Sequence, residues 1–200
     1  MIRTLVVNVN TSIMIRVSAV LVFLADFSTP GRPNTFGLPP AEANYIQPGK
    51  RPLSSMSPTL VFYSGDEDVT KAAKHDERPS NLGKLLMVVG ASGGPRIITA
   101  VVQVAINYIV LGMNLKDSVP HPRIHDQLLY HNEPSTLYDK DVVEPGYGLS
   151  NETYEALTRR GHSLLPTSYT GTCQAIAIDI ETNEIEAVSD IRKGGTPSGY

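Results

Sequence analysis

The stretch Gly49–Thr59 reads GKRPLSSMSPT and holds two adjacent serines, Ser54 and Ser55, between prolines. Each proline fixes its own φ angle and restricts the residue before it, so the serines are expected in an extended segment of set direction. An apolar strand is expected directly after this stretch, at residues 60–63. The sequence therefore predicts a rigid segment that presents two small hydrogen-bond donors.

A second stretch, VVGASGGP at residues 88–95, places Gly93 and Gly94 between a predicted strand and a predicted helix. Glycines adopt positive φ angles and let a ligand approach the backbone closely, and the free N–H groups of a first helical turn favour anions. Two rigid groups of donors indicate an oxyanion site, in which hydrogen bonds stabilise the negative charge of a transition state. We therefore predict that the two serines and the two glycines lie close together, although Gly93 follows Ser54 by 39 positions.

The composition indicates one domain and gives no reason to expect a nucleic-acid partner. The chain of 200 residues is 41% hydrophobic and 18% charged, which is enough for a core of its own. Its formal net charge of −3 offers no basic excess to attract nucleic acid or anionic lipid. Cys173 is the single cysteine, and its apolar neighbours predict a small buried side chain rather than a nucleophile.

The expected elements follow the order strands, helices, strands. They are an extended, turn-rich segment at 27–58, strands at 60–63 and 85–89, helices at 95–111 and 150–160, a short helix between Asn114 and Pro120, and a hairpin with strands at 172–180 and 185–188. The helix at 95–111 is apolar around most of its circumference, which is typical of a helix buried between layers. The order predicts an α+β layered architecture.

Three stretches match one known family in order along the chain. They are PGKRPLSSMSPT at 48–59, VGASGG at 89–94 and SDIRKGGTPSGY at 189–200. They resemble the small subunit of gamma-glutamyltransferases, also called glutathione hydrolases, and look most like plant members. The resemblance runs from about Asp26 to Tyr200. It implies the αββα sandwich of N-terminal nucleophile hydrolases, an α+β fold that this chain would leave incomplete because it supplies only the small-subunit half.

The resemblance also implies a division of the chain. Residues 1–25 fall outside it as an atypical apolar N-terminus, and residues 26–200 would form the small-subunit-like domain, with 65–84 as a charged insertion loop. The apolar run Val17–Ala25 is too short for a bilayer-spanning helix, which needs about 20 residues. We interpret it as a buried strand or an aberrant terminus rather than a signal peptide, although the resemblance suggests a secreted, cell-surface or vacuolar protein.

The resemblance assigns roles to particular residues. Five residues match the family's oxyanion and substrate-binding positions: Ser54, Ser55, Gly93, Gly94 and Asp26. Asp26 matches the aspartate that binds the substrate's α-amino group, but the family's nearby glutamate is replaced here by Phe23. The implied partners are glutathione or other gamma-glutamyl compounds and a large-subunit-like chain. Neither the residues nor the resemblance calls for a cofactor or a metal.

The family's nucleophile has no counterpart in this sequence. Family members attack with a threonine at the new N-terminus of the small subunit, where its own α-amine serves as the base. Neither Thr4 nor Thr11 has this context, and the arginine that clamps the substrate belongs to the large subunit. We therefore identify no catalytic residue and expect a truncated chain that is inactive alone. A non-catalytic fragment that binds a partner is a further alternative.

A rival hypothesis comes from the motif Gly-x-Ser-x-Gly at residues 90–94. Between a strand and a helix this motif is typical of the nucleophile elbow of an α/β-hydrolase. Ser92 would be the nucleophile, with Asp139 or Asp141 and then His162 completing the triad. Against it, only one pair of strands is predicted before the elbow, and no parallel βαβ ladder follows.

A group of possible metal ligands lies close together in the sequence: His121, His125, Asp126, His131 and Glu133. The spacing of the first two histidines suits a helix, on which both imidazoles would share a face. Pro120 and Pro122 prevent a helix there. We therefore expect ordinary surface and core contacts for these side chains.

Overall fold

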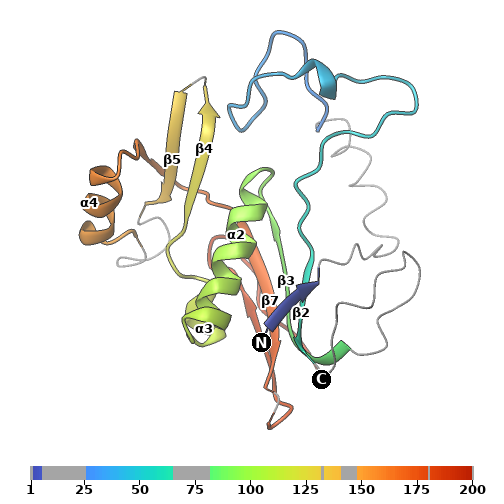
Figure 1. Cartoon of the computed structure of the whole chain (residues 1–200), viewed down its shortest axis with the longest axis vertical. Coiled ribbons are helices and arrows are strands. Elements are labelled where there is room, and N and C mark those ends of the chain that lie inside the picture. The colour runs from blue at the N-terminus through green and yellow to red at the C-terminus, as the bar shows by residue number, and fades with distance from the viewer. Residues whose placement is uncertain are drawn as a thin grey trace.

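A five-stranded antiparallel sheet forms the centre of the structure, a computed structural model that describes residues 2–5, 26–64, 82–131, 133–140, 148–179 and 181–199 (Figure 1). In spatial order its strands are β1 (Ile2–Leu5), β2 (Thr59–Ser64), β3 (Leu82–Ser92), β7 (Thr172–Ile178) and β8 (Ile185–Ser189). The expected strand at 85–89 is therefore longer at both ends, and the expected C-terminal hairpin is confirmed as β7 and β8.

The register of the sheet determines which residues of neighbouring strands lie opposite each other. Thr59 at the start of β2 is opposite Val89 near the end of β3, and Ser92 is opposite Thr172 at the start of β7. Side chains alternate between the two faces. One face contributes most of the buried core. Its core side chains on the strands are Val61, Met87, Val89, Cys173, Ala175 and Ala177.

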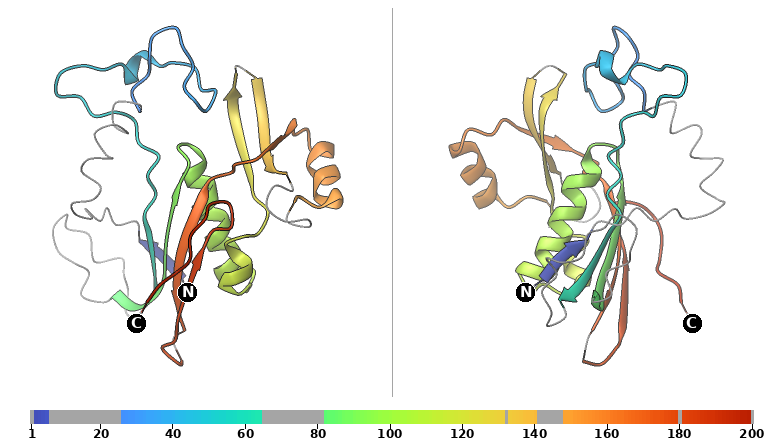
Figure 2. Two further views of the ribbon diagram at one scale, coloured as in Figure 1. Left: turned by 180° about the vertical axis from the view of Figure 1, so that it is seen from behind. Right: turned by 45° about the vertical axis from the view of Figure 1, so that its right-hand side comes forward.

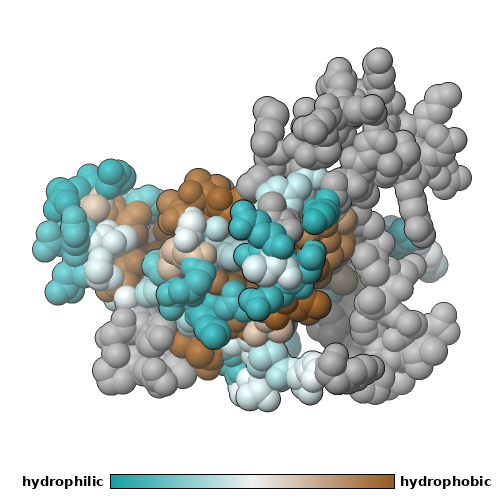
Figure 3. All heavy atoms as spheres, turned by 90° about the horizontal axis from the view of Figure 1, so that it is seen from below, coloured by the Kyte–Doolittle hydropathy of each residue, from teal (hydrophilic) through white to brown (hydrophobic). Residues whose placement is uncertain are grey.

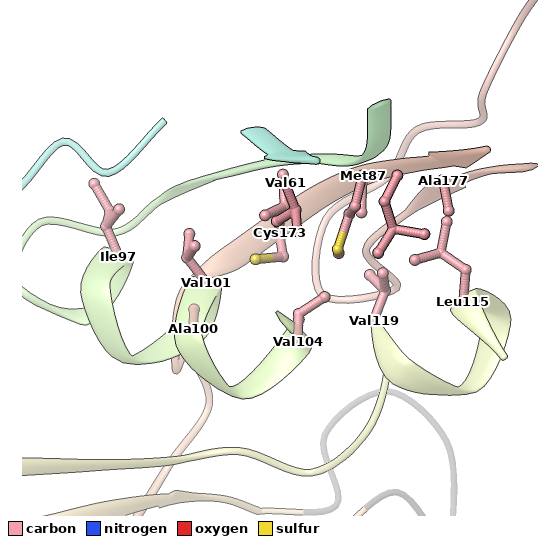
Figure 4. Packing of buried hydrophobic residues seen from close by; sticks show 13 residues of the cluster. Val61, Met87, Ile97, Ala100, Val101, Val104, Leu115, Val119, Cys173 and Ala177 are labelled. Atoms are coloured by element: carbon pink, nitrogen blue, oxygen red, sulfur yellow. The ribbon is translucent and has the colours of Figure 1, made fainter. Parts of the chain in front are cut away.

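Two helices cover that face of the sheet. Helix α2 (Arg96–Ala105) runs into a π-helical turn, η3 (Ile106–Val110), and packs on β3 and β7. Helix α3 (Leu115–Ser118) packs on β7 and β8, and the Asn114 side chain caps it by accepting from the N–H of Asp117. Figure 4 shows the resulting core, in which apolar side chains of both helices meet those of the strands.

A second, smaller sheet lies beside α2 (Figures 1 and 2). Strands β4 (Ile124–Tyr130) and β5 (Glu133–Asp139) are antiparallel, and β6 (Leu164–Thr167) pairs with β5 in parallel. The helix expected at 150–160 is α4 (Asn151–Arg159), which precedes β6. Ser150 caps it, because its hydroxyl accepts from the N–H of Thr153. The segment before β2 is extended and turn-rich, with one short 3₁₀ helix, η1 (Glu42–Asn44).

Buried ion pairs join the C-terminal segment to both sheets. Asp190 binds the guanidinium groups of Arg123 and Arg192 and accepts from the N–H of Cys173. Arg192 also binds Asp139 at the end of β5. Burial alone would raise the pKa of Asp190, but the positive charges of Arg123 and Arg192 outweigh it and hold that pKa below its ordinary value. The tail motif quoted above therefore has a structural role in this chain.

Two expectations from the sequence need correction. The helix at 95–111 is not buried all round, because within the described residues its outer side chains Ile98, Val102 and Ile106 are exposed. Strands β4, β5 and β6 were not predicted at all. The run Val17–Ala25 and most of the expected loop 65–84 lie outside the described residues. Across the residues that are described, no helix is long and apolar enough to cross a membrane.

Candidate functional site

The turn between β3 and α2 is the centre of the candidate site. Gly93 and Gly94 have φ angles of 137° and 59°, in the region that favours glycine. Their carbonyl groups accept the first bonds of α2, from the N–H of Arg96 and the N–H of Ile97. Their own N–H groups donate to no acceptor among the described residues. Two free donors thus lie at the N-terminus of a helix, where the helix dipole favours negative charge.

Aromatic side chains pack closely against this turn. A Cβ atom at Gly94 would overlap the ring of Phe36, and a Cβ atom at Gly93 would lie 3.0 Å from the Cα of Gly171. The same Cβ atom at Gly93 would lie 3.3 Å from the Tyr169 ring, whose hydroxyl donates to the carbonyl of Ser92 at 3.0 Å. Both glycines are therefore required by close packing as well as by their backbone angles.

The two predicted serines lie in the extended segment before β2. Because β2 and β3 are antiparallel and Thr59 is opposite Val89, Ser55 and Gly93 are each four residues beyond that pair, in the same direction. The hydroxyl of Ser54 accepts from the N–H of Met56 at 3.3 Å. The register thus directs the serine pair and the glycine pair to the same end of the sheet.

Asn44 ties the Asp26 region to the serine segment. Its side-chain amide donates to the carbonyl of Asp26 at 2.7 Å, and its side-chain oxygen accepts from the N–H of Leu53 at 2.8 Å, directly before Ser54. Partial burial raises the pKa of Asp26 above its ordinary value. Within the described residues Asp26 forms no ion pair.

A pocket of about 330 Å³ adjoins the turn, at the ends of β3 and β7. Its lining includes Ser92, Gln174, Lys193 and Thr172. The hydroxyl of Thr172 is buried and has no hydrogen-bond partner among the described residues, and Lys193 forms no ion pair there. The pocket therefore offers the positive charge of Lys193 to an incoming polar group.

The elbow hypothesis fails on the contacts of its members. The hydroxyl of Ser92 lies 3.4 Å from that of Tyr169, whereas His162 Nδ1 is 2.8 Å from the hydroxyl of Thr136 on β5. Asp139 is occupied by arginines and by Thr170, and Asp141 lies outside the described residues. The proposed nucleophile and base thus have separate partners.

His125, from the histidine-rich stretch, takes part in the core. It lies on β4 with Nδ1 2.8 Å from the Thr99 hydroxyl of α2 and Nε2 2.8 Å from Gln127 Oε1. Burial lowers the pKa of His125. The positive charge of Arg96 also lowers it, whereas the hydrogen bond that His125 donates to Gln127 raises it. The imidazole therefore joins α2 to the smaller sheet.

Several residues of the site had no signal in the sequence. Asn44, Phe36, Tyr169 and Arg96 act through contacts with residues distant in the chain, and none belongs to a motif quoted above. A lone asparagine or aromatic residue in a turn-rich segment is too common to be singled out. Only the fold reveals that these side chains surround the turn.

Comparisons with known proteins agree with this architecture. A sequence profile described as gamma-glutamyltranspeptidase matches residues 23–73 and 78–200. Glutathione hydrolase 2 of Arabidopsis thaliana is 36% identical over 185 residues, which cover 88% of this chain and 28% of that protein. Scoloptoxin SSD20 of Scolopendra dehaani is 31% identical over 175 residues, which cover 88% of this chain and 75% of that protein.

A solved structure extends the likeness to the fold. A mutant gamma-glutamyltranspeptidase of Helicobacter pylori superposes with a TM-score of 0.64 at 33% identity, covering 86% of this chain and 80% of that one. The fold is thus the α+β fold of the N-terminal nucleophile hydrolases, as expected. The chain nevertheless spans only 24% of one full-length relative, the glutathione hydrolase proenzyme 1 of Schizosaccharomyces pombe. By profile, sequence and fold, this chain belongs to the gamma-glutamyltranspeptidase family, which is a family of enzymes.

Proposed function

We propose that this chain supplies the oxyanion-stabilising and substrate-binding part of a site that transfers or hydrolyses the gamma-glutamyl group of glutathione or related compounds. The observation that carries the proposal is the pair of N–H groups at Gly93 and Gly94, which have no acceptor among the described residues. Family membership supplies the reaction class, and the turn supplies the chemistry that such a reaction needs.

The chemistry of acyl transfer explains why these donors matter. Attack on a gamma-glutamyl amide gives a tetrahedral intermediate whose former carbonyl oxygen carries a negative charge. Backbone N–H groups that are fixed before the reaction stabilise this charge without reorganising, and the N-terminal end of α2 adds a partial positive charge. Loss of one such donor typically lowers kcat by about 10²–10³-fold.

Asp26, Ser54 and Ser55 would bind the amino-acid end of the gamma-glutamyl group. A carboxylate with a raised pKa and no ion pair gains stability from a bound ammonium group, which Asp26 would find in the substrate's α-amine. The serine hydroxyls would donate to the substrate's α-carboxylate. Asn44 supports this assignment because it joins the backbone of Asp26 to that of Leu53 beside the serines.

The open face of the five-stranded sheet supports a large-subunit-like partner. Opposite the helices, Val88 and Ile176 are partly exposed, Ile176 by 43%, and Ile185 at the edge is 70% exposed. Apolar side chains also reach the surface among polar ones on the underside of the molecule (Figure 3). A second sheet stacked on this face would bury these residues and complete an αββα sandwich. Gamma-glutamyltransferases consist of a large and a small subunit processed from one precursor, which fits this arrangement.

We identify no attacking threonine for this site. Thr4 lies within β1, opposite Val61 on β2, and Thr11 lies outside the described residues. We therefore expect the chain as given to show no turnover of a chromogenic gamma-glutamyl anilide, with or without glycylglycine as acceptor. Robust turnover by this chain would contradict the expectation and would show that another group attacks.

A chimeric precursor tests the proposed function directly. Residues 26–200 would replace the matching part of a gamma-glutamyltransferase precursor that keeps its own large subunit and its N-terminal threonine segment. We expect the chimera to mature and to turn over the gamma-glutamyl anilide, because residues 26–200 would supply the donors and the substrate contacts. A chimera that matures but has no activity would contradict the proposal.

Matched variants of the chimera separate binding from folding. Replacing Ser54 and Ser55 with alanine should raise KM by roughly 10-fold or more, because two donors to the substrate are lost. Replacing the exposed Ser163 with alanine should leave KM unchanged. Equal effects of both changes would remove the substrate-binding role from the serine pair.

A further inference from the structure

The peptide group between Ser92 and Gly93 is held by a side chain from the opposite half of the chain. The Tyr169 hydroxyl donates to the carbonyl oxygen of Ser92 at 3.0 Å, and the Ser92 hydroxyl lies 3.4 Å from the same phenol oxygen. The phenol has one hydrogen, so it donates to the carbonyl and accepts from the Ser92 hydroxyl. Tyr169 thus makes two contacts with the residue before the glycine pair.

Holding this carbonyl fixes the direction of a neighbouring N–H group. The described residues contain no cis peptide bond, and in a planar trans peptide the C=O and N–H groups point in opposite directions. The carbonyl of Ser92 shares its peptide plane with the N–H of Gly93. A glycine gives this plane little restraint of its own, because it lacks a Cβ atom. The Tyr169 hydroxyl, together with the pairing of Ser92 with Thr172 in the sheet, therefore restrains the direction in which the Gly93 N–H points.

Tyr169 is itself held from several sides. Arg96 donates from Nη1 to the carbonyl oxygen of Tyr169, and its guanidinium group lies 5.9 Å from the Tyr169 ring and 5.7 Å from that of Phe36. The N–H of Tyr169 donates to the Thr167 hydroxyl at 3.3 Å. The next residue, Thr170, donates to the buried carboxylate of Asp139 at 2.5 Å. These contacts hold the backbone of Tyr169 in place, so that its phenol hydroxyl can hold the turn.

We propose that Tyr169 is a positioning residue for the oxyanion donor of Gly93, and that Arg96 holds Tyr169 in place. The hydroxyl of Tyr169 keeps the Gly93 N–H directed away from the protein and toward the position of the substrate oxygen. That this N–H group binds the substrate oxygen rests on the proposed function. The hold of Tyr169 on the peptide is a separate property that can be measured without any reaction.

Backbone ¹⁵N relaxation of the Gly93 amide tests the proposal on the purified chain. Tyr169→Phe removes only the hydroxyl and keeps the ring. We expect the order parameter of the Gly93 amide to fall from about 0.85, typical of a rigid backbone, to below about 0.6, typical of a flexible one. The amides of α2 and β7 should not change. Tyr154→Phe is the matched control, since it removes a phenol hydroxyl from α4, and it should leave Gly93 unchanged.

A second variant tests the role of Arg96. Arg96→Lys keeps the positive charge but loses the planar group that bonds to Tyr169 and stacks on the rings. We expect it to loosen the Gly93 amide as Tyr169→Phe does. An unchanged order parameter in Tyr169→Phe would overturn the proposal, whatever Arg96→Lys does. Because no turnover is needed, failure of the chimera would count against the proposed function and would leave this measurement to decide on Tyr169.

Discussion

Replacement of Asp190 by asparagine should remove a large part of the stability of this chain. The two carboxylate oxygens accept from four donors: Arg123 Nη2, the N–H of Cys173, the N–H of Arg192 and Arg192 Nη1. Asparagine has the same shape but presents an NH₂ group in place of one oxygen. Whichever way its amide is oriented, this NH₂ faces two of the donors. Arg123 loses the carboxylate with which it pairs, and Arg192 keeps only Asp139.

The size of the effect follows from burial. Asp190 and Arg123 are each 1% exposed, so water cannot replace the lost interactions. Removing one partner of a buried ion pair typically costs about 3–5 kcal/mol, because a charge is left buried and unpaired. A change of that size corresponds to a melting temperature lower by roughly 10 °C in a domain of this length.

Urea unfolding followed by circular dichroism measures this loss. The matched control is Glu155→Gln, which breaks the ion pair with Arg159 on α4, whose side chains are 69% and 68% exposed. Exposed pairs at this helical spacing contribute at most about 0.5 kcal/mol, so the control should unfold almost as the parent chain does. A loss below about 1 kcal/mol for Asp190→Asn would refute the argument that the buried network stabilises the fold.

Three further predictions test other parts of the structure. Gly94→Ala should destabilise the chain more than Gly112→Ala in urea unfolding. Both glycines have positive φ angles, but only Gly94 faces the Phe36 ring. Equal losses of unfolding free energy in the two variants would contradict this. His125→Gln should flatten the pH dependence of stability, because folding lowers the pKa of His125 below 6.5. The stabilisation by His125 is therefore complete above about pH 6.5 and shrinks as the pH falls. Identical pH profiles of the variant and the parent chain would disprove this. The purified chain should bind a hydrophobic dye, and Ile176→Lys on the open sheet face should reduce that fluorescence, whereas an unchanged signal would place the dye elsewhere.

The parts of the fold that the sequence predicted are those set by local chemistry. Asn114 and Ser150 begin their helices as capping residues, and most side chains along β7 alternate between buried and exposed positions. The missed strands carry prolines, Pro134 in β5 and Pro166 in β6, which argue against a strand when only the sequence is read. Their pairing is set instead by partners distant in the chain, which no local pattern reveals.

The candidate site divides in the same way. Gly93 and Gly94 could be singled out from the sequence as candidates, because a strand, two glycines and a helix start form a local pattern. Tyr169 was missed because its contact with Ser92 spans 77 residues and involves a common residue type in a loop. Asn44 was missed for the same reason, since its two backbone partners lie 18 and 9 positions away. The residues proposed to carry out chemistry were thus easier to single out from the sequence than the residues that contact them.

One buried carboxylate connects the stability of the fold to the geometry of the turn. Asp139 binds Arg192 from the tail and accepts from the backbone of Arg123, and it also accepts from Thr170, the residue after Tyr169. The carboxylate that anchors the tail therefore anchors the segment from which Tyr169 reaches Ser92. A change at Asp139 should loosen the Gly93 amide as well as lower stability, whereas Asp190 contacts the tail and β7 but not Thr170. Stability and the Gly93 order parameter, measured for a variant of each aspartate, therefore separate a residue that only stabilises the fold from one that also holds the Gly93 amide.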